Sequence, residues 1–351
     1  MINSLLRKIT NWEAWPFKLL YAPLVPFWVM YMLRSRAVWF FTPSNPKITF
    51  GGMEGEPKQE MYNLLPEGLY PNTIYVNPGM PETSLLDLLR NSGIQYPFVV
   101  KPDNGGQGIL FRKIDQPKQL LLYHKLVPDV YIIQDLIKYP MEVSVFYIRY
   151  PNNSNGIITG FLHKVPMHVV GDGSSTLCRL IEHHPKASKR IGELKLKHSE
   201  KWNSVLSAGE SYPLSFAANH NRGARFFDLK DQIDDKLVAV FDKISLQVDD
   251  FFYGRYDILC NNVDDLKQGK NFQIIEFNGC GAEPNHFYDT GYTLLGAYKE
   301  ILKHWKALYE ISKFNRQHRH IQPWPYWKGR EFLNSANQRT ARMKEIDKQI
   351  P

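Results

Sequence analysis

The sequence is poor in cysteine. It holds three, Cys178, Cys260 and Cys280, which is an odd number without the spacing of a zinc finger. A disulfide framework is therefore excluded, and a reducing compartment is the natural expectation, so we expect a cytoplasmic protein. Residues 1–17 also lack the organisation of a cleavable signal peptide.

The sequence also lacks an apolar run long enough for a transmembrane helix. Its uncharged segment Leu19–Leu33 is shorter than the roughly 20 residues that span a bilayer, and Pro23 and Pro26 interrupt any helix there. Flanking cations and tryptophans nevertheless make residues 12–41 resemble an anchor that lies on a membrane surface. The alternative is an aromatic arm packed on the body of the protein or on a second copy, and the length criterion favours this alternative.

The bulk composition is that of a globular protein. The 351 residues are 43% hydrophobic and 22% charged, so the chain can bury a sizeable core. Lys and Arg number 43 against 35 Asp and Glu, which gives a net charge of +8. This excess suits a polyanionic ligand or an acidic membrane surface. Residues 313–351 read as a basic tail without a recognition motif, so we expect no nucleic-acid partner.

No GKS or GKT loop for binding phosphates is present. The segment FVVKPDNGGQGIL (98–110) instead ends a strand in Lys101 and turns back through three glycines into a second strand. Glycines let backbone N–H groups approach phosphate oxygens, and a lysine adds a positive charge. The segment is thus a candidate phosphate-binding loop, although glycine hairpins are common.

Three further segments place polar side chains at strand ends. In GRYDI (254–258) and IIEFNG (274–279), which we expect to pair as a hairpin, Arg255 and Asp257 lie beside Glu276 and Asn278. Carboxylate and amide oxygens on one face suit a hard cation such as Mg²⁺.

In IIQDLIKYPMEVSVF (132–146), a buried strand runs into a short connection that can present backbone groups to a flat base, while Glu142 can accept hydrogen bonds from hydroxyls.

The pattern of elements predicts an α+β fold with mostly antiparallel sheets. Gly51, Gly52, Gly55 and Pro57 suggest a break after an aromatic-rich N-terminal arm, residues 1–50. The expected strands are 73–76, 98–102, 109–114, 131–137, 143–150, 157–165, 167–170, 254–260 and 272–278. The expected helices are 175–203, 231–251 and 291–312, with further helical segments within 60–95.

Taken in order, these segments resemble the ATP-grasp superfamily, specifically its carboxylate–amine ligases. The likeness is strongest to D-alanine–D-alanine ligase and to the ATP-grasp part of cyanophycin synthetase. Besides GRYDI and EFNG, it rests on HKVPMHVVGDGSSTLCRLIE (163–182) and GESYPLSFAANHNRGARFFDLKDQI (209–233). The resemblance covers roughly residues 85–290. It implies two α+β subdomains, 51–137 and 138–312, that clamp ATP between antiparallel sheets.

The resemblance also implies roles for individual residues. The ATP-binding set would be Lys58, Lys101, Asn104, Gly105, Gly106, Gln107, Gly108, Asp135, Leu136, Ile137, Glu142 and Lys164. Asp257, Glu276 and Asn278 would bind Mg²⁺, with Mn²⁺ as a substitute. Arg255 and Lys164 would be catalytic, and Asn221, Arg222, Gly223 and Gly281 would lie on the substrate side. Cys280 and His286 flank the metal loop as bystanders, because Mg²⁺ prefers oxygen.

The implied activity is an ATP-dependent ligase that joins a carboxylate to an amine through an acyl phosphate, with an amino acid or small peptide as substrate. Two alternatives stay open: a small-molecule kinase, and a non-catalytic nucleotide-binding module at a membrane surface. The chain departs from the ligases in having an aromatic arm in place of a strand–helix domain before Lys58. The loop NGGQG also lacks the serine of many ligases, and Asp135 stands where glutamate is commoner. Substrate identity and a homo-oligomeric state are therefore left open.

Overall fold

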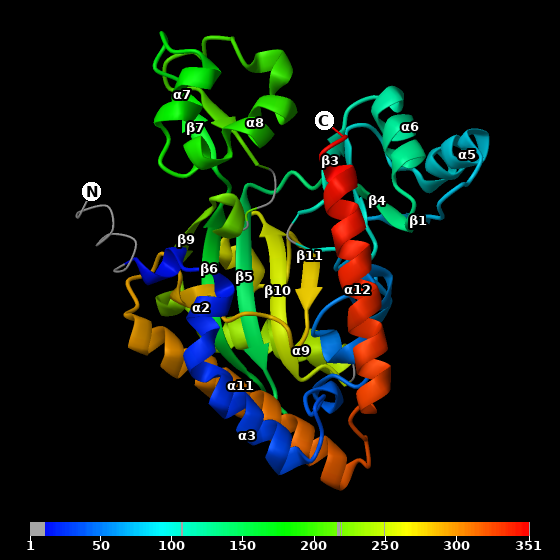
Figure 1. Ribbon diagram of the computed structural model, residues 1–351, viewed down its shortest axis with the longest axis vertical. Coiled ribbons are helices and arrows are strands. Elements are labelled where there is room, and N and C mark those ends of the chain that lie inside the picture. The colour runs from blue at the N-terminus through cyan, green and yellow to red at the C-terminus, as the bar shows by residue number, and fades with distance from the viewer. Residues whose placement is uncertain (1–10, 107, 216–217, 219, 249, 351) are drawn as a thin grey trace. The chain divides into compact units, whose positions relative to one another are not determined.

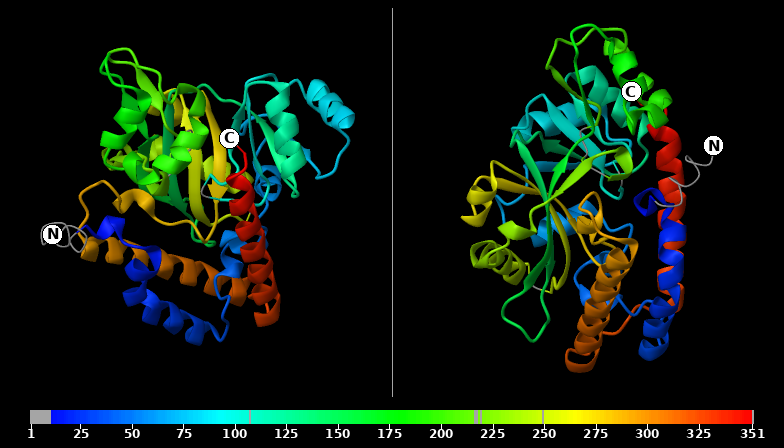
Figure 2. Two further views of the ribbon diagram at one scale, coloured as in Figure 1. Left: turned by 45° about the horizontal axis from the view of Figure 1, so that its top comes forward. Right: turned by 90° about the vertical axis from the view of Figure 1, so that its left-hand side faces the viewer.

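The computed structural model describes residues 11–350 except 107, 216–217, 219 and 249. The chain divides into two compact units (Figures 1 and 2). Unit 1 comprises residues 1–70, 143–163 and 226–336, and unit 2 comprises residues 71–142, 164–225 and 337–351. Residues 51–70 therefore group with the N-terminal arm, and residues 164–225 group with the segment that contains the glycine loop.

Unit 1 is built on a five-stranded sheet of order β11-β10-β5-β6-β9. Its strands are β5 (Met141–Ile148), β6 (Ile157–Val165), β9 (Arg225–Asp228), β10 (Tyr253–Cys260) and β11 (Phe272–Asn278). Its helices are α2 (Phe17–Tyr21), α3 (Val25–Ser35), α4 (Lys58–Leu64), α9 (Asp235–Gln247), α10 (Val263–Lys267) and α11 (Leu294–His318). Helix α12 (Tyr326–Asp347) contributes residues to both units.

Helices α9 and α11 cover opposite faces of this sheet (Figure 2). The alternation of side chains along β5 explains the arrangement. Phe146 and Ile148 join a buried cluster with Leu308 and Ile311 of α11. Tyr147 points to the other face, where its ring lies 6.5 Å from that of Phe241 in α9.

The N-terminal arm is fixed to unit 1 by one side of its helices. Leu20, Leu24 and Tyr31 are buried, and the ring of Tyr31 stacks 4.7 Å from that of Tyr309 in α11. Helix α3 lies alongside α11, on the side of α11 away from the sheet (Figure 2). Pro23 lies in a 3₁₀ turn between α2 and α3, where an interruption was expected, whereas Pro26 lies in the first turn of α3, where proline is tolerated.

A glycine-on-glycine contact joins the segment after the arm to the end of β11. The amide of Cys280 donates to the Gly51 carbonyl at 3.0 Å, and the amide of Gly281 donates to the Gly52 carbonyl at 2.9 Å. A Cβ at Gly52 would lie 2.7 Å from the Gly279 Cα. Gly51 and Gly52, which the sequence suggested as a break in the chain, are thus buried packing residues with φ of +67° and +73°.

Unit 2 contains a four-stranded sheet of order β1-β4-β2-β3 and a two-stranded sheet, β7-β8. The strands are β1 (Thr73–Val76), β2 (Phe98–Pro102), β3 (Arg112–Ile114), β4 (Tyr131–Asp135), β7 (His168–Val170) and β8 (Ser211–Pro213). The helices are α5 (Glu82–Ser92), α6 (Pro117–Leu126), α7 (Leu177–His183) and α8 (Ile191–Lys197). All pairs in these two sheets are antiparallel, which together with unit 1 confirms the α+β prediction.

The structure differs from the sequence expectations in several places. The helical segment expected at 175–203 consists of two short helices, α7 and α8, with 3₁₀ turns directly before and shortly after α8. Residues 313–351, expected to be a basic tail, are mostly helical. Helix α11 continues to His318, and α12 is a second long helix. Its buried residues Ala336 and Met343 pack on the protein, which a reading based on charge alone did not reveal. In the described part of the chain, no helix is both long and apolar enough to cross a membrane.

His304 gives the fold a dependence on pH. The residue is buried in α11, and its Nδ1 and Nε2 contact the Glu300 carbonyl at 2.8 Å and the Thr159 hydroxyl at 2.9 Å. One donor and one acceptor nitrogen suit the neutral ring. Burial, helped by the charge of His286, lowers the pKa of His304 to about 3. Between pH 6.5 and 3 the unfolded state binds the proton that the folded state excludes, so the stability falls as the pH falls.

We predict that this one histidine removes roughly 1 kcal/mol of stability per pH unit in the middle of that window, where the ring is protonated in the unfolded state and neutral in the folded state. Urea unfolding at pH 7.5 and 5 should show a smaller loss of stability in His304→Gln than in the wild type. His318→Gln, which changes an exposed histidine of the same helix, is the control. An equal loss in all three proteins would contradict the prediction.

Candidate nucleotide and metal site

The hairpin β10–β11 brings the expected metal-binding residues together. Asp257 lies directly opposite Glu276, and Arg255 lies opposite Asn278. Because residues two apart share a face, all four side chains lie on one face at the same end of the hairpin. The sequence prediction of this arrangement agrees with the strand register.

A β-bulge makes that register possible. The pairing shifts by one residue between Asp257 and Ile258, so Ile275 is the extra residue of the bulge. The carbonyl of Ile275 instead accepts a hydrogen bond of 2.6 Å from the Tyr62 hydroxyl of α4. The shift lets Ile258 and Ile274 meet in the core while Asp257 and Glu276 face each other.

Arg255 is the positive centre of this acidic group. Its Nε and one terminal nitrogen donate to the two Asp257 oxygens at 3.3 and 3.2 Å, and its other terminal nitrogen donates to the Glu283 carbonyl at 3.1 Å. Burial alone would lower its pKa, but Asp257, Glu276 and Glu283 outweigh burial and raise the pKa of Arg255. The guanidinium is thereby fixed and fully charged.

The donor set suits a hard divalent cation. Asp257, Glu276 and Asn278 offer only oxygen ligands, and Mg²⁺ takes few of these from protein and fills the other positions with water and phosphate. The amide of Asn278 currently donates to Asp257 at 3.4 Å, which leaves its carbonyl oxygen as the ligand atom. The residues therefore fit the metal that the resemblance implies, while the binding itself stays a proposal.

Sequence reasoning missed two carboxylates near this group. Glu56 is partly exposed overall, but its Oε2 atom is buried. This atom has no hydrogen-bond partner among the described residues. Burial raises the pKa of Glu56 to about 7, with the negative charges of Glu276 and Glu60 acting in the same direction and Lys58 opposing them. Lys58, expected to bind ATP, is buried at the start of α4 and is close enough to act on Glu56.

The second missed carboxylate is Glu283, in the loop after β11. Its Oε1 accepts hydrogen bonds from the hydroxyls of Tyr21 at 2.7 Å and Tyr288 at 3.0 Å. Burial raises the pKa of Glu283, and the two tyrosines and Arg255 partly offset that effect. Tyr21 belongs to α2, so the N-terminal arm helps to hold the loop whose carbonyl binds Arg255.

The loop residues Cys280, Gly281 and His286 are held by packing and backbone hydrogen bonds within unit 1. Burial, with the nearby charge of Glu56, raises the pKa of the Cys280 thiol well above its usual value, so the thiol stays protonated. His286 is buried against Gly160, where a Cβ would collide with its ring. Gly281, assigned to substrate by the resemblance, uses its amide for Gly52.

In unit 2, the glycine loop connects two paired strands as expected. β2 and β3 are antiparallel, with Val100 opposite Arg112, and Lys101 lies near the end of β2. Asn104, Gly105, Gly106 and Gly108 follow in the loop. Gly108 has a φ of +68°, which other residues rarely adopt. Gln107 lies outside the described residues.

The strand β4 ends at Asp135, so the expected base-binding residues Leu136 and Ile137 lie in the irregular segment after it. The amide of Asp135 donates to the Asn72 carbonyl at 3.0 Å, which fixes the strand end. Burial raises the pKa of the Asp135 carboxyl.

Glu142 and Lys164, which were expected to contact ribose and phosphate, form an ion pair. Their Oε1 and Nζ atoms are 2.6 Å apart, and the side chains are only 11% and 7% exposed. The two residues lie on the neighbouring strands β5 and β6. The pair neutralises two charges that would otherwise be costly to bury.

The residues of unit 2 that were expected on the substrate side, 221–223, lie in or directly after the 3₁₀ turn His220–Arg222. The guanidinium of Arg222 donates to Glu193 at 3.2 Å, and Glu193 also binds Arg190 and Lys197. Gly223 has a φ of +89°, and a Cβ there would lie 2.6 Å from the Met167 sulfur. The side chain of Asn221 lies outside the described residues.

Comparison with solved structures gives several matches at low sequence identity. D-alanine–D-alanine ligase from Bacillus anthracis is 13% identical with a TM-score of 0.45, over 77% of this chain and 70% of that chain. The ATP-grasp ligase PsnB is 14% identical with a TM-score of 0.38, over 70% and 60% of the two chains. A bifunctional glutathione synthetase from Pasteurella multocida is 14% identical with a TM-score of 0.37, over 70% of this chain but 36% of that one.

The chain is similar in fold to ATP-grasp ligases. The matches do not say what the chain does, because their identities and TM-scores are low. No family model matches the chain. No curated protein matches it either.

The close approach of Gly281 to the backbone of Met53 gives a first prediction for this site. Gly281→Ala should lower the stability of unit 1 by about 1–3 kcal/mol or more, because the new Cβ would overlap the Met53 carbonyl, which belongs to rigid backbone. Thermal unfolding measures the loss. Gly296→Ala, in the first turn of α11 where the nearest atoms are side chains at 3.3 Å, is the control. Equal unfolding temperatures for the two variants would refute this account of the loop.

The buried ion pair yields a second prediction. Glu142→Gln and Lys164→Met should each lower the stability by up to about 3–5 kcal/mol, because each removes one charge of a buried ion pair. The double variant should cost clearly less than the sum of the two. Urea unfolding gives the coupling, and the exposed pair Glu345 and Lys348, 2.7 Å apart, serves as the control cycle. Additive costs at the buried pair would mean that the two charges do not depend on each other.

Proposed function

We propose that this protein is an ATP-dependent carboxylate–amine ligase that acts on an amino acid or small peptide through an acyl phosphate. The observation that supports it most is the β10–β11 hairpin, with Asp257 opposite Glu276 and Arg255 opposite Asn278. A group of acidic side chains around one arginine at a strand end is costly to maintain for packing alone. It suits a site where phosphate oxygens and their metal must be received.

In the proposed reaction, a carboxylate oxygen of the substrate attacks the γ-phosphorus of ATP. The bond from that phosphorus to the β–γ bridging oxygen breaks, which gives an acyl phosphate and ADP. An amine then attacks the acyl carbon and loses a proton, and phosphate departs with the former carboxylate oxygen. The protein's contribution is positioning and stabilisation of charge rather than covalent chemistry.

The proposal gives each group of residues a part. Lys101 and the loop from Asn104 to Gly108 bind the triphosphate of ATP through a positive charge and backbone amides. Asp135–Ile137 receive the adenine, and Glu142 accepts hydrogen bonds from the ribose while Lys164 balances its charge. Substrate contacts are assigned to Asn221–Gly223 and Gly281.

Arg255 is assigned to the negative charge that develops on the acyl phosphate and the tetrahedral adduct. Its two hydrogen bonds to Asp257 and its third to the Glu283 carbonyl set the direction of the guanidinium. A fixed donor of this kind costs little reorganisation during the reaction. When Mg²⁺ is bound by Asp257, Glu276 and Asn278, it supplies neutralisation of phosphate charge.

We predict that Glu276→Gln lowers the rate of ADP formation by a factor of about 10²–10³ or more, because one ligand charge for the metal is lost. The fold should persist, since Glu276 lies at a strand end and is not fully buried. The assay is a screen of amino acids and dipeptides for ADP formation with Mg²⁺, followed by the variant on the best substrates. Glu331→Gln, an exposed carboxylate of α12, is the control. Near-wild-type turnover by Glu276→Gln would reject the assignment of Glu276.

The same screen separates the ligase from a kinase. A ligase releases phosphate only when a carboxylate and an amine are both present, and its product is an amide. A kinase forms ADP with one substrate and retains the phosphoryl group on the product. ATP binding without any product from all the mixtures would instead favour a non-catalytic nucleotide-binding module.

A further inference from the structure

The outer side of the N-terminal arm is apolar where a water-facing helix is normally polar. Six large apolar side chains of α2 and α3 are 40–74% exposed, and we call them the outer face of the arm: Phe17, Leu19, Val25, Phe27, Val29 and Leu33. The other exposed positions between residues 16 and 33 are alanine and proline, apart from Lys18. The helices of the arm are therefore apolar on both sides, whereas an amphipathic surface helix has one polar side.

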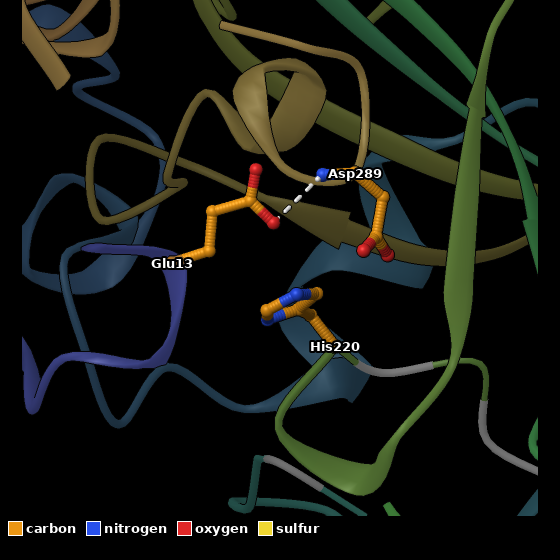
Figure 3. Close-up of side chains that lie close together, drawn as sticks. All are labelled: Glu13, His220 and Asp289. Carbon is orange, nitrogen blue, oxygen red and sulfur yellow. Dashed lines mark hydrogen bonds between the residues drawn. The ribbon is translucent and has the colours of Figure 1, made fainter. Parts of the chain in front are cut away.

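The arm cannot turn this face inward without losing its contacts to unit 1. Its inner side is already used: the ring of Trp28 lies 4.8 Å from Phe40 and 4.9 Å from Trp305. At the beginning of the arm, the Glu13 carboxylate accepts a hydrogen bond of 3.3 Å from the Asp289 backbone amide (Figure 3). The outer face is therefore a permanent feature of the surface of unit 1.

The charged residues that flank this face along the arm are positive. Between Glu13 and Glu54 the sequence contains no acidic residue, while Lys18, Arg34 and Arg36 flank the apolar positions and are exposed. On helix α11, which lies alongside α3, the exposed Lys303 and Lys306 pair with Glu300 and Glu310 at 3.8 and 3.7 Å and so add little net charge. An apolar face bordered by cations is complementary to a bilayer surface that carries anionic headgroups.

A second copy of the chain is a poorer occupant for the same reason. A two-fold contact through the outer face would bring this cationic border against its own copy, and no acidic residue of residues 14–53 could balance it. Crossing the bilayer is excluded by length, since α3 has 11 residues and roughly 20 are needed. The helix can only lie in the plane of the interface.

We propose that the outer face of the arm docks unit 1 on an anionic lipid bilayer. The apolar side chains enter the boundary between headgroups and acyl chains, and Lys18, Arg34 and Arg36 pair with the lipid phosphates. This surface is independent of the proposed ligase activity, and its test does not require ATP or a substrate.

The test is cosedimentation of the full chain with vesicles of phosphatidylcholine alone and of phosphatidylcholine with 30% phosphatidylglycerol. Wild type should bind the anionic vesicles at least about tenfold more tightly, and added salt should weaken that binding without abolishing it. The triple variant Phe17→Ser, Val29→Ser, Leu33→Ser should bind at least tenfold more weakly. Lys18→Gln with Arg34→Gln should reduce the preference for anionic vesicles, because two of the three cations that pair with lipid phosphates are lost.

The control triple variant Leu122→Ser, Ile157→Ser, Leu246→Ser changes exposed apolar residues elsewhere and should bind like the wild type. Circular dichroism melting checks that each variant is folded, which we expect because the substituted side chains are exposed. The proposal is overturned if the wild type does not bind vesicles or if the arm variant binds as well as the wild type. It is also overturned if sedimentation equilibrium shows a dimer that the arm variant abolishes while vesicle binding is absent.

Discussion

The candidate site depends on the close approach of two backbone segments, Gly51–Met53 and Gly279–Gly281. Two amide–carbonyl hydrogen bonds join them, and no side chain larger than hydrogen fits at Gly52 or Gly281 without displacing backbone. The buried Asn45 secures the first segment, because its amide nitrogen donates to the carbonyls of Gly51 and Tyr253 at 3.1 and 2.9 Å. The starts of β10 and of the loop after β11 are thus held together.

This contact positions three parts of unit 1. It fixes the end of β11, where Asn278 faces Arg255, and it places Glu56 and Lys58 next in the chain. It also holds the loop whose Glu283 connects Arg255 to Tyr21 of the arm. The proposed membrane surface and the proposed metal site are therefore attached to the same rigid core. The proposals remain separate, because each has its own residues.

Much of the fold could be predicted from the sequence, and the failures have identifiable causes. The bounds of β2, β6 and β11 agree with the prediction, because alternating apolar residues and turn residues define them. The helix expected at 231–251 begins only at Asp235, because Asp234 caps it by accepting from the Leu237 amide. Gly51 and Gly52 appeared to mark a break, since sequence does not distinguish a linker glycine from one in a tight contact.

The site was predictable where it depends on local pairing. The alternation along each strand was enough to place Asp257 on one face of β10, and Glu276 with Asn278 on one face of β11. The bulge at Ile275 was not foreseen, because it depends on the core contact of Ile258 with Ile274 and on the Tyr62 hydroxyl. The pairing of Glu142 with Lys164 was likewise missed, since it requires knowing that β5 and β6 are neighbours.

The most direct test of the central claim is the binding of Mn²⁺, which replaces Mg²⁺ and is visible by electron paramagnetic resonance. Protein-bound Mn²⁺ is measured in the presence of a non-hydrolysable ATP analogue, for the wild type, Asp257→Asn and Glu331→Gln. Our account predicts that Asp257→Asn weakens Mn²⁺ binding by at least about tenfold, which corresponds to about 1.4 kcal/mol, while Glu331→Gln binds as the wild type does. Equal Mn²⁺ affinity in all three proteins would contradict the assignment of the hairpin as the metal site.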